Sequence, residues 1–139
     1  MNQIAIFWPM LAQVLLVYIV YVVMGARRFG AVRSGAAKTS QFRNRGTEPE
    51  GSATAANNLA NQFELPVLFY VLCLALYATA GVSFVALILM WLFVISRYVH
   101  AFVHVTANRV MQRSQVFMFG LGVLGLGWIW FALHLLRSV

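Results

Sequence analysis

Residues 65–96 decide the fold: they read LPVLFYVLCLALYATAGVSFVALILMWLFVIS, a run of 32 residues without a charged side chain. As a single helix this run would be about 48 Å long, whereas the hydrocarbon core of a bilayer is about 30 Å thick. Small and polar residues occupy its middle, at 79–83. We therefore expect two membrane helices joined by a tight hairpin, each continuing as a more polar helix away from the turn.

Two further apolar segments, residues 4–24 and 116–136, are each long enough to cross a bilayer. The whole chain is 62% hydrophobic and 9% charged, whereas a soluble domain has about 25% charged residues. The sequence therefore predicts an all-α fold, a four-helix transmembrane bundle that forms a single domain over residues 1–139. We expect its helices at about residues 4–26, 56–80, 83–108 and 115–137.

Lys and Arg residues set the expected orientation because they gather between helices. They are Arg27, Arg28, Arg33, Lys38, Arg43 and Arg45 after the first helix, and Arg109 and Arg113 after the third. The positive-inside rule places these loops, the first at about residues 29–55, in the cytoplasm. Both termini are then on the non-cytoplasmic side of the inner (plasma) membrane. The net charge of +7 is thus a topology signal, and we expect no nucleic-acid partner.

Polar residues at the level of the helices are costly in lipid unless they are paired or face a cavity. On the second helix, Asn57, Asn61 and Glu64 have the spacing i, i+4 and i+7, which predicts one shared stripe. The third helix has two such stripes. One contains Arg97, His100, His104 and Asn108, and the other contains Tyr98, Phe102, Val105 and Arg109.

The predicted hairpin returns these stripes to the cytoplasmic side, where the first helix also ends. We expect one cationic pocket there, with an aromatic rim and lipid beside it, suited to a small anionic cofactor that meets a lipophilic substrate. Its residues would be Arg27, Arg28, Asn61, Glu64, Arg97, Tyr98 and Arg109. The alternative is that Glu64 and Arg97 form a structural ion pair between two helices.

Three other features have mainly structural interpretations. His100 and His104 have a spacing that chelates metals, but a third ligand beyond Glu64 is missing, so we expect interhelical hydrogen bonds and no metal. Cys73, the only cysteine, lies in an apolar run and is expected to be inert. The small residues Gly120, Gly122, Gly125 and Gly127 predict close packing of the last helix, either within the bundle or at a subunit interface.

Three motif regions, taken in order, resemble the MAPEG superfamily, the membrane-associated proteins in eicosanoid and glutathione metabolism. They are GARRF at 25–29, NNLANQFELP at 57–66, and RYVHAF at 97–102 continuing to Asn108 and Arg109. The resemblance covers nearly the whole chain, and the chain looks like a bacterial-type branch of the superfamily. It implies a homotrimer that binds glutathione between neighbouring subunits at the cytoplasmic side.

The resemblance also implies roles for single residues. Arg109 matches the arginine that stabilises the glutathione thiolate, and Arg28 matches an arginine with a proposed catalytic role. Asn61, Glu64 and Tyr98 match positions that hold the peptide. The eicosanoid branch of the superfamily differs at four of these or neighbouring positions, with Arg at the position of Asn57, Tyr at Leu65, Tyr at Phe102 and Arg at His104.

Three hypotheses about function follow. The first is a glutathione-dependent transferase or peroxidase that acts on a lipophilic electrophile taken from the bilayer. The second is a non-enzymatic membrane scaffold or accessory subunit with other membrane proteins as partners. The absence of the Arg and Tyr donors that the eicosanoid branch has at these four positions favours it. The third, weaker hypothesis is a lipid or quinone binder that uses the same pocket.

Overall fold

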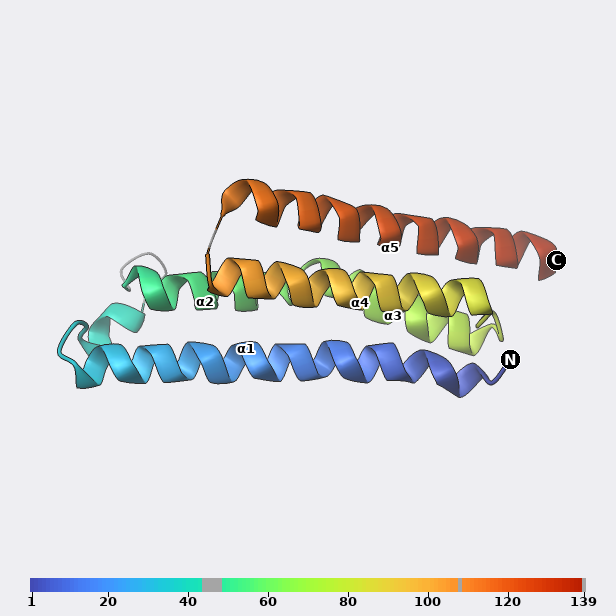
Figure 1. The fold of residues 1–139 in the computed structure, drawn as a ribbon. Helices are drawn as coiled ribbons and strands as arrows, with labels where there is room; N and C mark the ends of the chain where they lie inside the picture. The colour runs from blue at the N-terminus through green and yellow to red at the C-terminus, as the bar shows by residue number, and fades with distance from the viewer. Residues whose placement is uncertain (44–48, 108, 139) are drawn as a thin grey trace.

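The chain folds into helices that lie side by side in a bundle (Figure 1). The computed structural model describes residues 1–43, 49–107 and 109–138; Arg45 and Asn108, which the sequence predictions include, lie outside these ranges. The α-helices are α1 (Phe7–Arg33), α2 (Glu50–Asn61), α3 (Leu65–Ala78), α4 (Phe84–Val105) and α5 (Val110–Ser138). Two short 3-10 helices, η1 (Gln3–Ile6) and η2 (Thr39–Phe42), complete the described part.

Four segments are long and apolar enough to cross a membrane. They are Gln3–Arg33, Glu50–Ala78, Phe84–Val105 and Val110–Arg137, so α2 and α3 together form the second one. The predicted all-α, four-helix transmembrane bundle is therefore confirmed.

The helix bounds differ from the predicted ones mainly at one end of the bundle. α1 continues to Arg33 instead of residue 26, and α2 begins at Glu50 instead of residue 56, so the linker is shorter than residues 29–55. α4 ends at Val105, and α5 begins at Val110 instead of residue 115. Apolar length marks only the part of a helix that crosses the lipid, and polar turns beyond it keep their helical propensity.

The second membrane segment also departs from the predicted single helix of residues 56–80. α2 stops at Asn61 and α3 starts at Leu65, with Gln62, Phe63 and Glu64 between them. Pro66 lies in the first turn of α3, where its missing N–H is tolerated. A proline disfavours helical backbone in the preceding turn, which explains why the helix breaks there.

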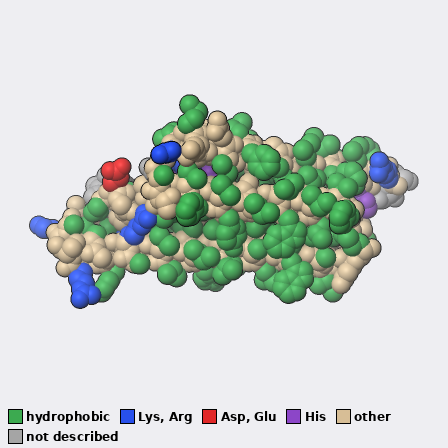
Figure 2. All heavy atoms as spheres, in the orientation of Figure 1, with side chains coloured by type: hydrophobic (Ala, Val, Ile, Leu, Met, Phe, Trp, Pro, Cys, Tyr) green, Lys and Arg blue, Asp and Glu red, His purple; other side chains and the backbone are tan. Residues whose placement is uncertain are grey.

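Both termini and the α3–α4 turn lie at one end of the bundle, which we call the terminal end (Figure 1). The opposite end, where α1 finishes and η2 lies, is called the basic end, since Arg33, Lys38 and Arg43 are there. Hydrophobic side chains cover most of the surface between the two ends on the face in Figure 2. α4 packs against α1, α2 and α5, and its contact with α5 is the most extensive.

The core of the bundle is a cluster of buried aromatic and aliphatic side chains from α3, α4 and α5. Phe69 and Phe93 stack with their ring centroids 4.9 Å apart. Leu72, Met90 and Leu124 surround them and are almost entirely buried. These contacts fix the position of α3 against α4 and α5.

The hairpin is closed by hydrogen bonds that end α3. The Gly81 N–H donates to the Leu76 carbonyl (2.8 Å), and the Ala80 N–H donates to the Tyr77 carbonyl (3.2 Å). This pair of bonds is a Schellman motif, with Ala80 in the left-handed region (φ 53°) where glycine is usual. Ser83 then caps α4, because its Oγ accepts from the Ala86 N–H (3.2 Å). The predicted turn at 79–83 is therefore present.

The glycines of α5 divide into two pairs. A Cβ added at Gly127 would lie 2.8 Å from Met90 Cε and 2.9 Å from Leu72 Cδ2, so this glycine allows close packing in the core. Gly120 likewise faces Ser96. A Cβ at Gly122 or Gly125 would meet nothing within 4 Å, so these two face outward. Packing within the bundle therefore accounts for only half of the small-residue pattern.

We expect the substitution Gly127→Ala to destabilise the bundle in detergent by about 1–3 kcal/mol, because overpacking forces Met90 and Leu72 to shift. Gly122→Ala is the matched control: it gains the same helix propensity on the same helix, about 1 kcal/mol, without a clash. Thermal unfolding of both variants measures the difference. A Gly127→Ala protein as stable as the control would contradict the packing described here.

Candidate functional site

Arg97 is the most buried cation of the described chain, with 1% of its surface exposed. Its Nη2 donates to the backbone carbonyl of Asn61 (3.3 Å), and its guanidinium lies 5.8 Å from the centre of the Phe117 ring. Glu64 lies within electrostatic range of Arg97. The Asn61 carbonyl is at the end of α2, where carbonyls lack helical partners and carry partial negative charge. Arg97 thus neutralises the α2–α3 junction from inside the bundle.

His100 and His104 continue the Arg97 stripe and are buried as well. Their rings are 5.8 Å apart, edge to face. His100 Nδ1 lies 3.2 Å from the backbone carbonyl of Arg113, and because a carbonyl only accepts, Nδ1 carries the proton. Among the described residues, no third His, Cys, Asp or Glu gathers with this pair. What the structure shows is an interhelical hydrogen bond between α4 and α5.

The stripe predicted on the second helix faces away from the bundle. Asn57 and Glu64 are exposed, and Asn61 is partly exposed. Glu64 lies in the break between α2 and α3, within a segment that is long enough to span a membrane. A charged side chain at that depth is costly when it faces lipid. In the single chain this stripe is open to its surroundings and could contact protein or a polar ligand there.

A second polar stripe, one residue further along α2, faces inward and was not predicted. Gln13 Nε2 donates to Gln62 Oε1 (2.9 Å), and Gln62 Nε2 donates to Asn58 Oδ1 (2.9 Å). Asn58 Nδ2 then donates to the carbonyl of Ala101 (3.2 Å). The chain of hydrogen bonds joins α1, α2 and α4. Its sequence signal is Asn58 and Gln62 at i and i+4, together with Gln13 alone in an apolar helix.

Two predicted pocket residues, Arg27 and Tyr98, are engaged by backbone carbonyls. Arg27 Nη1 donates to Gly51 (2.9 Å), and its Nη2 donates to Val105 (2.7 Å), which ties α1 to the ends of α2 and α4. The Tyr98 hydroxyl donates to Ala12 of α1 (2.8 Å). Both side chains therefore hold helices together in the single chain.

Arg28 and Arg109 are the two remaining predicted site residues. The Arg28 guanidinium is 5.3 Å from the centre of the Phe42 ring, and Arg28 lines a cavity of about 280 Å³ with Tyr21 and Phe63. Arg109 is exposed just before α5. Within one chain, the predicted residues therefore occupy a buried cluster, an outward stripe and two separate cationic positions, and they do not line one common pocket.

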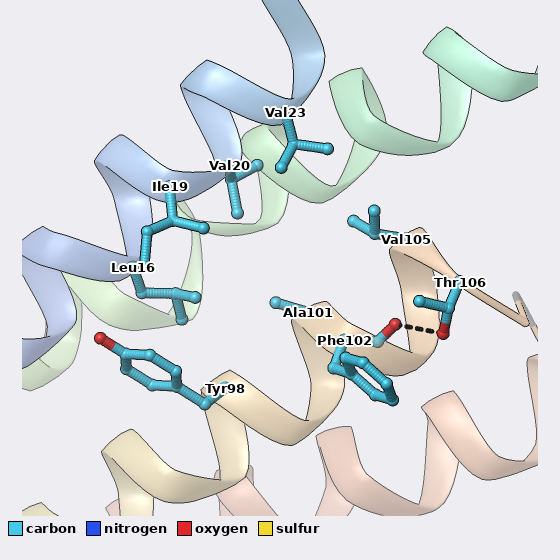
Figure 3. A pocket seen from close by; sticks show the side chains of 9 residues that line it. All are labelled: Leu16, Ile19, Val20, Val23, Tyr98, Ala101, Phe102, Val105 and Thr106. Carbon is cyan, nitrogen blue, oxygen red and sulfur yellow. Dashed lines mark hydrogen bonds between the residues drawn. The ribbon is translucent and has the colours of Figure 1, made fainter. Parts of the chain in front are cut away.

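An apolar groove of about 220 Å³ runs between α1 and α4 (Figure 3). Its walls are aliphatic and aromatic, with Leu16, Val20, Tyr98 and Phe102 among the lining residues. Figure 3 shows the Tyr98 ring on α4 pointing toward Leu16 of α1, while the Phe102 ring lies at the edge of the groove and is exposed. A groove of this composition fits an apolar chain better than a polar cofactor.

Comparison with known proteins identifies one family. The sequence profile of the MAPEG family matches residues 5–133 of the chain. No curated protein and no solved structure matches the chain.

The inward polar stripe allows a direct test. We expect Gln62→Leu to destabilise the protein by about 1–3 kcal/mol, because the buried Gln13 Nε2 and Asn58 Oδ1 lose their partner. Asn57→Leu, on the outward stripe of the same helix, should leave the thermal midpoint in detergent nearly unchanged. Equal losses in the two variants would show that the inward chain of hydrogen bonds does not hold the helices.

Proposed function

The chain belongs to the MAPEG family, and from this premise we propose that it is a glutathione-dependent transferase or peroxidase acting on lipophilic electrophiles. Its site would form between copies of the chain in a homotrimer. The observation that carries the proposal is the outward stripe of Asn57, Asn61 and Glu64, which belongs to a segment long enough to span a membrane and is exposed or partly exposed in the single chain.

The chemistry of the stripe fits glutathione. A carboxylate such as Glu64 accepts hydrogen bonds from the ammonium group of the peptide, and the amide of Asn61 offers both a donor and an acceptor. Arg97 lies directly behind the stripe and supplies positive charge without reaching the outside. A neighbouring subunit seated on this face would exclude lipid and water, which strengthens each of these interactions.

Arg109 and Arg28 are the residues proposed for the reaction. A guanidinium beside the cysteine of glutathione favours the thiolate, which is the nucleophile. For a transferase, the thiolate sulfur forms a bond to an electrophilic carbon, and the leaving group or opened ring takes the electron pair and a proton. For a peroxidase, two glutathione molecules reduce one lipid hydroperoxide to the alcohol and water and become the disulfide. The groove between α1 and α4 offers the lipophilic substrate a path from the bilayer.

A specific observation favours a second candidate, a scaffold or accessory subunit without glutathione chemistry. Arg27 and Tyr98, two of the residues proposed to bind the peptide, already donate to backbone carbonyls in their own bundle. On this hypothesis the polar stripes only join helices and subunits. The two candidates predict opposite responses to glutathione.

The orientation of the chain is part of the proposal. Lys and Arg residues at the basic end support a cytoplasmic location of that end in an inner (plasma) membrane, by the positive-inside rule. The terminal end would then face away from the cytoplasm, and the proposed site would draw on cytoplasmic glutathione.

The proposed function predicts that millimolar glutathione raises the thermal midpoint of the purified protein in detergent, by mass action. It also predicts a thiolate absorbance band in the ultraviolet that Arg109→Ala reduces by about tenfold or more, because a charge-assisted hydrogen bond contributes about 1.5–3 kcal/mol. Arg33→Ala removes an exposed arginine at the same end of the bundle and should keep the band.

The result that would end the enzyme hypothesis is the absence of both signals in the wild-type protein. The scaffold candidate would then remain. If glutathione stabilised the protein and formed a thiolate, but Arg109→Ala changed neither signal, the enzyme hypothesis would remain and the proposed role of Arg109 would be wrong.

For the orientation, we expect a reporter enzyme that folds only outside the cytoplasm to be active when fused after residue 139 in a bacterial host. The same reporter inserted between residues 38 and 39 should be inactive, because that segment lies at the basic end. The reverse pattern of activity would overturn the proposed orientation.

A further inference from the structure

A small polar cleft lies at the terminal end, far from the proposed glutathione site. It has a volume of about 180 Å³ and lies between the α3–α4 turn and the last turns of α5. Its lining includes Ser83, Trp130, His134 and Arg137. Figure 2 shows a histidine and a basic side chain together at this end. None of these residues takes part in the function proposed above.

The walls of the cleft are fixed by hydrogen bonds within the chain. Trp130 Nε1 donates to Ser83 Oγ (3.0 Å), and His134 Nε2 lies 3.1 Å from the Thr79 carbonyl. Because that carbonyl only accepts, Nε2 carries the proton. A Cβ on Gly81 would lie 2.7 Å from the His134 ring, so only glycine lets the turn approach α5 this closely. Because these side chains are already ordered, binding of a ligand in the cleft costs little conformational entropy.

The charge of the cleft is positive. Arg137 lies on its rim with its side chain exposed. The three acidic residues of the chain all lie between residues 48 and 64, so no acidic side chain of the sequence follows Glu64. Among the described residues, therefore, no acidic side chain of α5 or of the hairpin turn pairs with Arg137. An exposed guanidinium without an acidic side chain on its own helix can bind an external anion.

The position and size of the cleft narrow the choice of anion. It lies where the membrane-spanning segments end, which is the level of lipid headgroups. Its volume equals that of about six water molecules at roughly 30 Å³ each, which is enough for one tetrahedral anion and too little for a whole lipid. Arginine matches phosphate oxygens with two parallel N–H donors. Leu133 on the same wall offers contact to an adjoining acyl chain.

We propose that this cleft binds a phosphate group, with Arg137 as its main donor and Ser83 and Trp130 as its fixed walls. The phosphate comes from an anionic phospholipid or from free inorganic phosphate, and both sources present the same chemistry to the cleft. In a membrane, the lipid would tie the α3–α4 turn and α5 to the headgroup layer.

The test compares the wild-type protein with Arg137→Gln and with the control Arg33→Gln, an exposed arginine at the opposite end. Each is purified in detergent and titrated with phosphatidylglycerol, phosphatidylcholine or inorganic phosphate, and bound molecules are counted by native mass spectrometry. We expect one phosphatidylglycerol to bind the wild-type and control proteins, with about tenfold or more weaker binding to Arg137→Gln. Arg137→Lys should keep part of the affinity, since it retains the charge.

The remaining arms identify the source of the phosphate. Binding of inorganic phosphate with the same dependence on Arg137 supports a free-phosphate site, and binding of phosphatidylglycerol alone supports a lipid site. Equal binding of phosphatidylglycerol to wild-type and Arg137→Gln proteins would overturn the proposal. Arg137 and Trp130 would then be interfacial anchors that hold no particular ligand.

Discussion

Lipid offers no hydrogen-bond partner, so every polar atom that this chain brings to membrane depth needs a partner from protein or ligand. That constraint acts most strongly at the junction of α2 and α3. The helix break at residues 62–64 leaves the Asn61 carbonyl without a helical partner, and the buried Arg97 donates a hydrogen bond to it. Close by, Gln62 links Gln13 of α1 to Asn58 of α2. One level of the bundle thus fixes the rotation of several helices together.

The outward site follows from this inward one. At about 100° per residue, turning Asn58 and Gln62 into the bundle places Asn57 and Asn61 roughly a quarter turn away, toward the surface. The stripe proposed to hold glutathione is therefore the neighbour, on the same helix, of the stripe that holds the helices. Substitutions that disturb the inner stripe should also rotate the outer one, so stability and the proposed glutathione binding would be coupled through helix rotation.

The membrane topology could be predicted from the sequence because an uncharged run of 32 residues is too long for one membrane helix and long enough for two. Residues 79–83 marked the turn between them. The inward stripe could not be predicted from the sequence. Two adjacent polar stripes on α2 have the same period, and contacts such as that with Gln13 show which one faces inward. The internal hydrogen bonds of Arg27 and Tyr98 could not be predicted for a related reason. Their partners are backbone carbonyls, which every residue possesses and which leave no signal in a sequence. Whether any of the predicted site residues binds a cofactor or takes part in catalysis stays a prediction.

The partners of the arginines suggest how structural and functional cations can be separated in a small membrane bundle. Arg27 and Arg97 donate to backbone carbonyls at helix ends, where partial negative charge needs compensation from within the chain. Arg109 and Arg137 are exposed at opposite ends of the bundle, beside different surfaces. An N–H group that already donates to a backbone carbonyl would have to break that bond before it could bind an external anion. The exposed Arg109 and Arg137 carry no such cost, which is why they are the arginines proposed to meet a thiolate and a phosphate.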